Sequence, residues 1–292
     1  MAYTSGDTIL DDHYNGFATS VNSVWGTGSG DSGYGQTSTV SAVAAGNTVT
    51  AAQWTTLLAR ISSMASHQGS SITAISNPSA GTTISAFAAI STNITTVTNN
   101  RLNVASRQGV VTGNVSTATN LTGTITQTGH WAFPSEAQAR YFFNAGGRMS
   151  CTWALSGGTG YSKYNQWVEL TGPVGTYYIY AQTSGKSGGS GTANINDTNA
   201  GWHDLTGSYV TVFRQYEDTG PYTANRIDLN LYKTGANVYW QTQWIDDAPE
   251  NEVDGSGNVT GTKTFAMKHE RPAVTYISDT WGTITHVVDA TG

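Results

Sequence analysis

The stretch Arg226-Ile227-Asp228-Leu229-Asn230-Leu231-Tyr232 alternates apolar and polar residues with a period of two. Such alternation is typical of a β-strand that buries one of its faces. A second alternating run, Asn237-Val238-Tyr239-Trp240-Gln241, follows after a few turn-forming residues. This part of the chain therefore predicts a sheet with one buried side.

The same alternation recurs through most of the second half of the chain, in the runs 149–155, 166–170, 209–213 and 263–267. Turn-forming clusters separate these runs, and no long helical pattern lies between them. A short helix is expected to begin at a capping box formed by Ser135 and Gln138 and to end at Gly146-Gly147. We therefore expect a mainly β protein whose C-terminal domain, residues 129–292, is an antiparallel β-sandwich.

The front of the chain follows a different pattern. A phrase of small residue, Gly, any residue, Thr and aliphatic residue occurs at 5–9, 45–49 and 80–84, and helical spacing of apolar residues follows each copy. The spacing between copies falls within the range of about 20–50 residues expected of structural repeats. The alternative is that they are three similar helix-cap junctions without common ancestry. We expect a small α-helical N-terminal region at 1–105 and a polar extended connector at 106–128.

The second copy of the phrase predicts a helix most clearly. Thr50 and Gln53 fit a capping box, in which each side chain bonds the backbone of the other residue. The following apolar residues keep the 3-and-4 spacing of one buried helical face. We expect them to anchor the N-terminal helices, either within a small domain or against another subunit: Trp54, Leu57, Leu58 and Ile61.

The expected helix caps are weaker in the other two copies. In the third copy the cap is Ser85. In the first copy Leu10 stands at the aligned position and cannot cap, so Asp11 or Asp12 is expected to do so instead.

No motif of catalysis or cofactor binding stands out. Gly28, Gly30 and Gly33 formally satisfy G-x-G-x-x-G, but they follow a helix-like segment where a dinucleotide site needs a strand, so we expect a surface loop. The six histidines lack metal-ligand spacing, and Cys151 is the only cysteine. We expect no enzyme activity, no cofactor and no metal site; a polysaccharide depolymerase stays open, because a fold can bring Asp and Glu pairs together.

Charge is scarce along the whole chain. Charged residues make up 11%, against roughly 25% in an average soluble protein. No Lys/Arg cluster offers a face for nucleic acid, and no stretch approaches the ~18 apolar residues of a membrane span. Uncharged polar side chains suit repeated subunit contacts, because burying them costs less than burying charges. We therefore expect a homo-oligomer, with a trimer as the order for a fibre.

Two further features are candidates for binding. The acidic stretch 246–254 is dense in the oxygen ligands that calcium prefers, but it lacks the EF-hand spacing, and a solvated hairpin loop is the alternative. Trp131, Trp202 and Trp281 stand among polar neighbours. They are expected either to stack on a glycan or to lie in the core or an interface.

Several stretches resemble virion structural proteins of tailed bacteriophages, especially those of aquatic and cyanobacterial phages. The most specific is the run from Ala139 to Arg148, in which Tyr-Phe-Phe precedes Gly-Gly. The opening residues 2–9, the Gln53-Trp54 helix and the stretches 201–205 and 244–249 are also similar. The resemblance supplies no catalytic residues.

The resemblance implies a virion protein that is assembled in the host cytoplasm. We expect a non-enzymatic structural component of the tail, baseplate or fibre, in contact with other virion proteins, with N-terminal attachment and an outward β domain. One alternative is an adhesin that binds a receptor or a host surface glycan. Another is a decoration protein of the capsid or neck.

Overall fold

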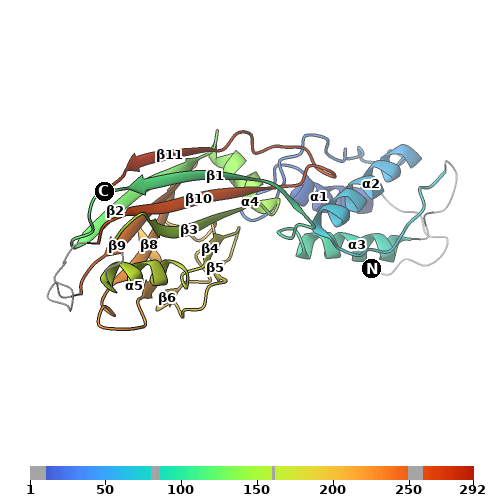
Figure 1. Cartoon of the computed structure of the whole chain (residues 1–292). Helices are drawn as coiled ribbons and strands as arrows, with labels where there is room; N and C mark the ends of the chain where they lie inside the picture. Colours follow the sequence, from blue (N-terminus) through green and yellow to red (C-terminus); the bar gives the residue numbers. More distant parts are fainter. Residues whose placement is uncertain (1–10, 80–83, 85, 160–161, 249–258) are drawn as a thin grey trace. The chain divides into compact units, whose positions relative to one another are not determined.

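Figure 1 shows the computed structural model, which describes residues 11–79, 84, 86–159, 162–248 and 259–292. The chain forms two compact units. Unit 1 comprises residues 1–108, 140–146 and 271–281, and unit 2 comprises residues 109–139, 147–270 and 282–292. These boundaries differ from the expected ones, because two later stretches belong to the helical unit and most of the expected connector belongs to the β unit.

Unit 1 contains three long helices that pack on one another. They are α1 (Asp11–Trp25), α2 (Ala51–Gln68) and α3 (Phe87–Asn99), drawn in blue to teal in Figure 1. Tyr14 of α1 packs edge-on against Trp54 of α2, with ring centroids 5.1 Å apart, and both side chains are buried. The predicted helical region near the N-terminus is confirmed.

The capping box of α2 is confirmed in detail. The Thr50 side chain accepts a hydrogen bond from the backbone N–H of Gln53 at 3.3 Å, and Gln53 Oε1 accepts one from the backbone N–H of Thr50 at 2.8 Å. Gly69 ends the helix in the left-handed conformation, with φ of 69°.

The other two copies of the phrase are largely outside the described residues. These include residues 5–9 and Leu10 of the first copy, and residues 80–83 and Ser85 of the third. Helix α1 begins at Asp11 and carries Asp11 and Asp12 in its first turn. Helix α3 begins after Ala86, which makes no side-chain cap.

The short helix after residue 134 is also confirmed, as α4 (Glu136–Asn144). Ser135 Oγ accepts from the backbone N–H of Gln138 at 3.2 Å, as the predicted box requires. Beyond the helix, Gly146 adopts a positive φ of 87°.

The glycine-rich stretch 26–36 is a loop, as expected, and its residues 27–30 are exposed. Its second half is packed more closely, and Tyr34 is fully buried. Arg140 of α4 donates one hydrogen bond to the carbonyl oxygen of Thr27 and one to that of Ser32, both at 2.6 Å. The surface loop therefore also packs within unit 1.

Extended stretches of unit 1 are held by side-chain amides. Asn22 Nδ2 donates to the carbonyl oxygen of Val40, and the Val40 N–H donates to Asn22 Oδ1, both at 2.8 Å. Asn15, two turns earlier on α1, makes the same pair with Val43. An amide side chain can thus satisfy both polar groups of an extended residue, as a neighbouring strand would.

Unit 2 is built from strands that pair antiparallel in two sheets. The strands are β1 (Arg107–Thr117), β2 (Thr124–Ala132), β3 (Arg148–Ser156), β4 (Thr176–Ile179), β5 (Ser184–Ser187), β6 (Ile195–Asn196), β7 (Val210–Tyr216), β8 (Arg226–Thr234), β9 (Asn237–Ile245), β10 (Thr262–Pro272) and β11 (Thr285–Ala290). One sheet has the order β1-β10-β3-β4-β5 and the other β11-β2-β9-β8-β7-β6.

Aromatic side chains from both sheets form the core between them. Trp153 of β3 stacks on Phe213 of β7 with centroids 5.4 Å apart, and Trp240 of β9 contacts Phe265 of β10 at 4.6 Å. All four residues are buried. The burial pattern of β9 alternates for most of its length, as the period of two predicts. The expected antiparallel sandwich agrees with this arrangement.

Two local predictions in unit 2 were wrong. Residues 166–170 are helical, within α5 (Ser162–Thr171), because Lys163, Trp167 and Leu170 form one buried helical face while Val168 is exposed. The expected connector at 106–128 contains β1 and the start of β2. The stretch has no clear alternation of apolar and polar residues because most β1 side chains, on both faces of the strand, are exposed.

Candidate functional site

Some kinds of site are not found in the part of the chain that the structure describes. There, no group of three or more His, Cys, Asp or Glu side chains could hold a metal ion. The helices of that part are also too short or too polar to cross a bilayer. The lone Cys151 is buried, and burial raises the pKa of its thiol, so it stays protonated at neutral pH.

In the described part of the acidic stretch, Asp246 and Asp247 are paired with basic side chains. Asp246 is buried and lies 2.8 Å from Nζ of Lys163, which is also buried. Asp247 contacts Arg226. The rest of the stretch falls mostly on residues 249–258, outside the described residues, so calcium binding remains untested.

The three candidate tryptophans are core residues, which decides between the two expectations in favour of the core and against rings open to a glycan. Trp131, Trp202 and Trp281 are 0%, 3% and 0% exposed. Trp131 lies on the inward face of β2, whereas its sequence neighbours His130 and Ala132 point to the opposite face.

The four expected anchoring residues divide into two groups. Trp54, Leu57 and Ile61 are buried in the core of unit 1, so they stabilise the unit rather than face a neighbour. Leu58 is only half-buried. Its side chain lines a pocket of unit 1, where Trp54 forms part of the same wall.

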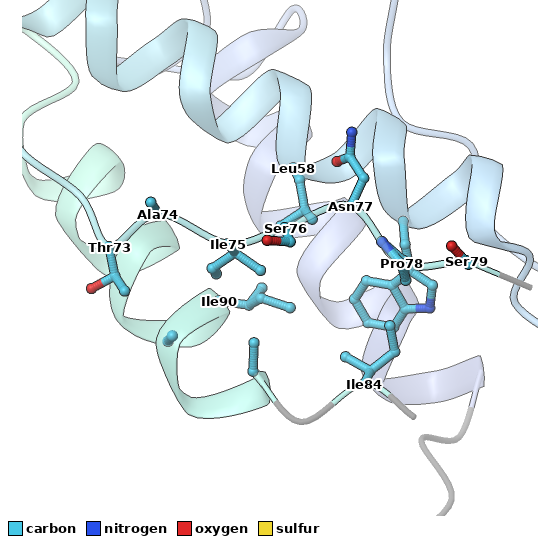
Figure 2. Close-up of a pocket in the computed structure, with 13 residues that line it drawn as sticks. Leu58, Thr73, Ala74, Ile75, Ser76, Asn77, Pro78, Ser79, Ile84 and Ile90 are labelled. Carbon is cyan, nitrogen blue, oxygen red and sulfur yellow. The ribbon is translucent and has the colours of Figure 1, made fainter. Parts of the chain in front are cut away.

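That pocket is a groove of about 500 Å³ beside α2 and α3, shown in Figure 2. Its apolar lining comes from both helices and from the segment after α2: Trp54, Leu58, Ile75, Pro78, Ile84 and Ile90. Thr73, Ser76, Asn77 and Ser79 add polar groups, and none of the described residues that line the groove is charged. A groove of this kind favours an uncharged, apolar occupant.

A side-chain amide fixes one wall of the groove. Asn93 of α3 donates through Nδ2 to the carbonyl oxygen of Thr73 at 2.8 Å, and the Thr73 N–H donates to Asn93 Oδ1 at 2.9 Å. A second hollow of about 290 Å³ shares Leu58 and residues 73–75 with the first and extends to Ile72 and Asn93. Segment 72–79 therefore borders open space, although Asn93 holds its backbone at Thr73.

A second surface, which the sequence analysis missed, is an aromatic row on three strands of the six-stranded sheet, β2, β9 and β8, continued by Tyr209 just before β7. His130 lies opposite Tyr239, and Tyr239 lies opposite Tyr232. The rings of Tyr232 and Tyr239 are stacked, with centroids 4.4 Å apart and planes 6° apart. Tyr209 meets Tyr232 edge-on at 4.5 Å and is 41% exposed, and Asp289 bonds His130 at 3.0 Å.

The stacking limits what this row can bind. Tyr232 and Tyr239 cover one face of each other, which leaves less ring surface for a sugar. Tyr209, at the end of the row, is the most exposed of its aromatic residues. Burial, followed by nearby Tyr232 and Asp289, raises the pKa of Tyr209 to about 12, so its phenol remains a hydrogen-bond donor at neutral pH.

Sequence alone carried one signal for this row. Tyr232 and Tyr239 stand at equal distances from the turn at Gly235-Ala236, so a tight hairpin makes them cross-strand neighbours. His130 and Tyr209 join them only through the strand order of the sheet.

The groove of unit 1 and the aromatic row of unit 2 are thus two candidate binding surfaces among the described residues. A scan against protein-family profiles, a search of curated proteins and a search of solved structures each gave no match to this chain.

Proposed function

We propose that this chain is a non-enzymatic structural component of a tailed-bacteriophage particle, in its tail, baseplate or fibre. In this proposal unit 1 attaches the protein to its neighbours and unit 2 faces outward. The resemblance of residues 139–148 and of the other quoted stretches supports the particle assignment. The observation that carries the attachment role is the groove beside α2 and α3.

The proposed occupant of the groove is an apolar segment of a neighbouring particle protein. The lining residues that the structure describes are all uncharged, so an apolar segment would not leave one of them as an unpaired buried charge on binding. Leu58, Ile75 and Pro78 are half-buried in the free chain and would lose their remaining exposure. Burial of apolar surface at about 25 cal/mol per Å² makes such an exchange favourable.

Labelled antibody against this chain, imaged on intact particles, tests the particle assignment. Label on the tail, baseplate or fibre is the expected result. Label confined to the head would favour a capsid decoration protein, and unlabelled particles would refute the proposal.

A matched pair of variants tests the attachment role. Leu58→Lys places a charge in the groove, whereas Ala59→Lys places it on the exposed side of the same helix. Particles assembled with Leu58→Lys should lack the chain, and those with Ala59→Lys should retain it. Circular dichroism of both purified variants checks that they fold, and equal incorporation of the two would exclude the groove.

Glycan binding is a second candidate, favoured by the exposure of Tyr209 at the end of the aromatic row. Binding on a glycan array should be lost in Tyr209→Ala and kept in Tyr276→Ala, which removes a similarly exposed tyrosine of unit 1. An array with no bound glycan would remove this candidate.

A further inference from the structure

We propose that β1 is a self-association edge, where β1 of one copy pairs antiparallel with β1 of a second copy about a twofold axis. Strand β1 ends the five-stranded sheet and pairs with β10 on one side only (Figure 1). Its other side presents backbone N–H and C=O groups that can pair with another chain. This inference does not depend on the particle assignment.

The other sheet ends carry features that block such pairing. Strand β6 has two residues, and β5 has four and includes Lys186. The chain also covers β5, because the Ser184 N–H donates to the carbonyl oxygen of Thr198 at 3.1 Å. Strand β11 has an irregular register between Val288 and Ala290 and carries Asp289. Short length, charge, covering and bulges are the known protections of sheet edges.

Strand β1 is not protected by short length, charge or proline along most of its length, although His286 of β11 lies against Gly113 and Thr117 Oγ1 donates to the carbonyl oxygen of Thr291. It has eleven residues, and after Arg107 it contains neither a charged residue nor a proline. Gly109 has a positive φ of 55°, which interrupts the strand near its start. Residues 110–117 then form an uninterrupted run of about 26 Å at the usual rise per residue.

Exposure of apolar side chains on both faces of β1 points to a missing partner. Val110 and Val111 are 59% and 46% exposed, and as consecutive strand residues they point to opposite faces. Val111 shares its face with Val115 and Thr117, which are buried further along the strand. The inner face is therefore left uncovered at one end of β1, and a paired strand would place its own side chains beside the two valines and reduce their exposure.

A second copy of β1 is the partner that fits. Because β1 is the least protected sheet end among the described strands, the complementary edge is the same edge of another copy. Antiparallel pairing of identical strands is isologous and closes as a dimer, which excludes open filaments. It joins two five-stranded sheets into one continuous sheet and gives a dimer in place of the trimer expected from the sequence.

Sedimentation velocity of the full chain over a range of concentrations tests this proposal. The wild-type chain should sediment as a dimer. The double variant Val110→Lys, Thr112→Lys, which puts two charges on the edge, should sediment as a monomer. Val288→Lys is the matched control, because it charges a residue of the β11 edge that is 43% exposed, and it should remain dimeric.

Hydrogen exchange keeps the test decisive if the double variant fails to fold. In the wild-type chain, amides of residues 110–117 should exchange more slowly at high concentration than at low concentration, whereas those of β11 should not change. A monomer at all concentrations, a trimer, a dimer that survives the double variant, or a dimer whose β1 amides are unprotected would each overturn the proposal.

Discussion

Asn93 of α3 binds both polar groups of the Thr73 backbone, as donor at 2.8 Å and as acceptor at 2.9 Å. The Asn93 side chain is buried, although Thr73 itself is exposed. This pair ties the segment 73–79, which lines the groove, to α3, which lines it too. The Asn93 amide therefore helps to fix the shape of the groove.

Replacing this amide by an isosteric carboxylate should loosen the groove. In Asn93→Asp the side chain still accepts from the Thr73 N–H but no longer donates to its carbonyl oxygen, and it sets a negative charge against that oxygen. We expect a loss of about 1–3 kcal/mol in the free energy of unfolding. Urea denaturation measures it, and hydrogen exchange of residues 71–79 should become faster.

The exposed Asn99→Asp on the same helix is the control for this prediction. It places the same charge near the C-terminus of α3, where the helix dipole makes it unfavourable by less than about 1 kcal/mol. Equal effects of the two variants would contradict the role given to Asn93.

Features of the fold were predictable from the sequence where the interacting residues lie close together along the chain. The capping box of α2 was predictable because Thr50 and Gln53 are three residues apart. The run 166–170 has apolar side chains at 167, 168 and 170, and five residues are too few to separate the strand period from the helix period. The buried helical face also includes Lys163, a residue type that a sequence pattern does not count as buried.

The candidate sites were less predictable because tertiary contacts decide exposure. Neither spacing nor composition pairs Asn93 with Thr73, since such a pair requires the path of the chain after α2. For Trp131 the sequence left the glycan alternative open because the neighbours of a strand residue lie on the other face. Likewise, only the strand order brings Tyr209 beside Tyr232.

Two glycines of the loop 26–36, Gly33 and Gly30, allow a test of whether close packing requires glycine there. Gly33 has φ of 102°, and a Cβ atom there would lie 2.3 Å from the carbonyl oxygen of Thr27. Gly30 also has a positive φ, 54°, but a Cβ atom there would meet open space. Gly30→Ala should therefore cost only the backbone strain, about 1–2 kcal/mol.

Gly33→Ala should cost clearly more than Gly30→Ala, because the backbone must also move. Thermal unfolding of the two variants compares them, and soluble expression gives the ranking if Gly33→Ala does not fold. Similar melting temperatures would indicate that the loop is not packed as described.

Acid should destabilise unit 1 through His67. This side chain is buried and lies 2.9 Å from the carbonyl oxygen of Ala145; burial lowers its pKa, and the bond to Ala145 offsets part of that shift. The unfolded chain thus binds a proton at a higher pH than the folded chain does. The stability contribution of neutral His67 is present above about pH 6.5 and is lost as the pH falls below it.

His67→Gln should remove this pH dependence while an amide takes the place of the ring. Urea unfolding at pH 7.5 and at pH 5 measures it: the wild-type chain should lose more stability than the variant. His286, whose pKa burial also lowers, is present in both proteins and cancels in the difference. Parallel losses would show that His67 does not titrate in this way.

Lys263 should also make the free energy of unfolding rise with pH, but in the alkaline range. Its Nζ donates to the carbonyl oxygens of Thr119, Val259 and Gly261 at 2.9–3.0 Å, and burial lowers its pKa to about 8 from 10.5. Between these two values the unfolded chain binds more protons than the folded chain. The free energy of unfolding should therefore rise, through this group, as the pH increases from 8 to 10.5.

The variant Lys263→Met isolates this contribution, because the buried tyrosines that also titrate at high pH are common to both proteins. The advantage of the wild-type chain over Lys263→Met in urea unfolding should be smaller at pH 7 than at pH 10. This follows because the folded state no longer has to keep a charged ammonium away from water once it has released the proton. A difference that stays constant or shrinks as the pH rises would mean that Lys263 keeps its charge at little cost, with its three carbonyl partners replacing water.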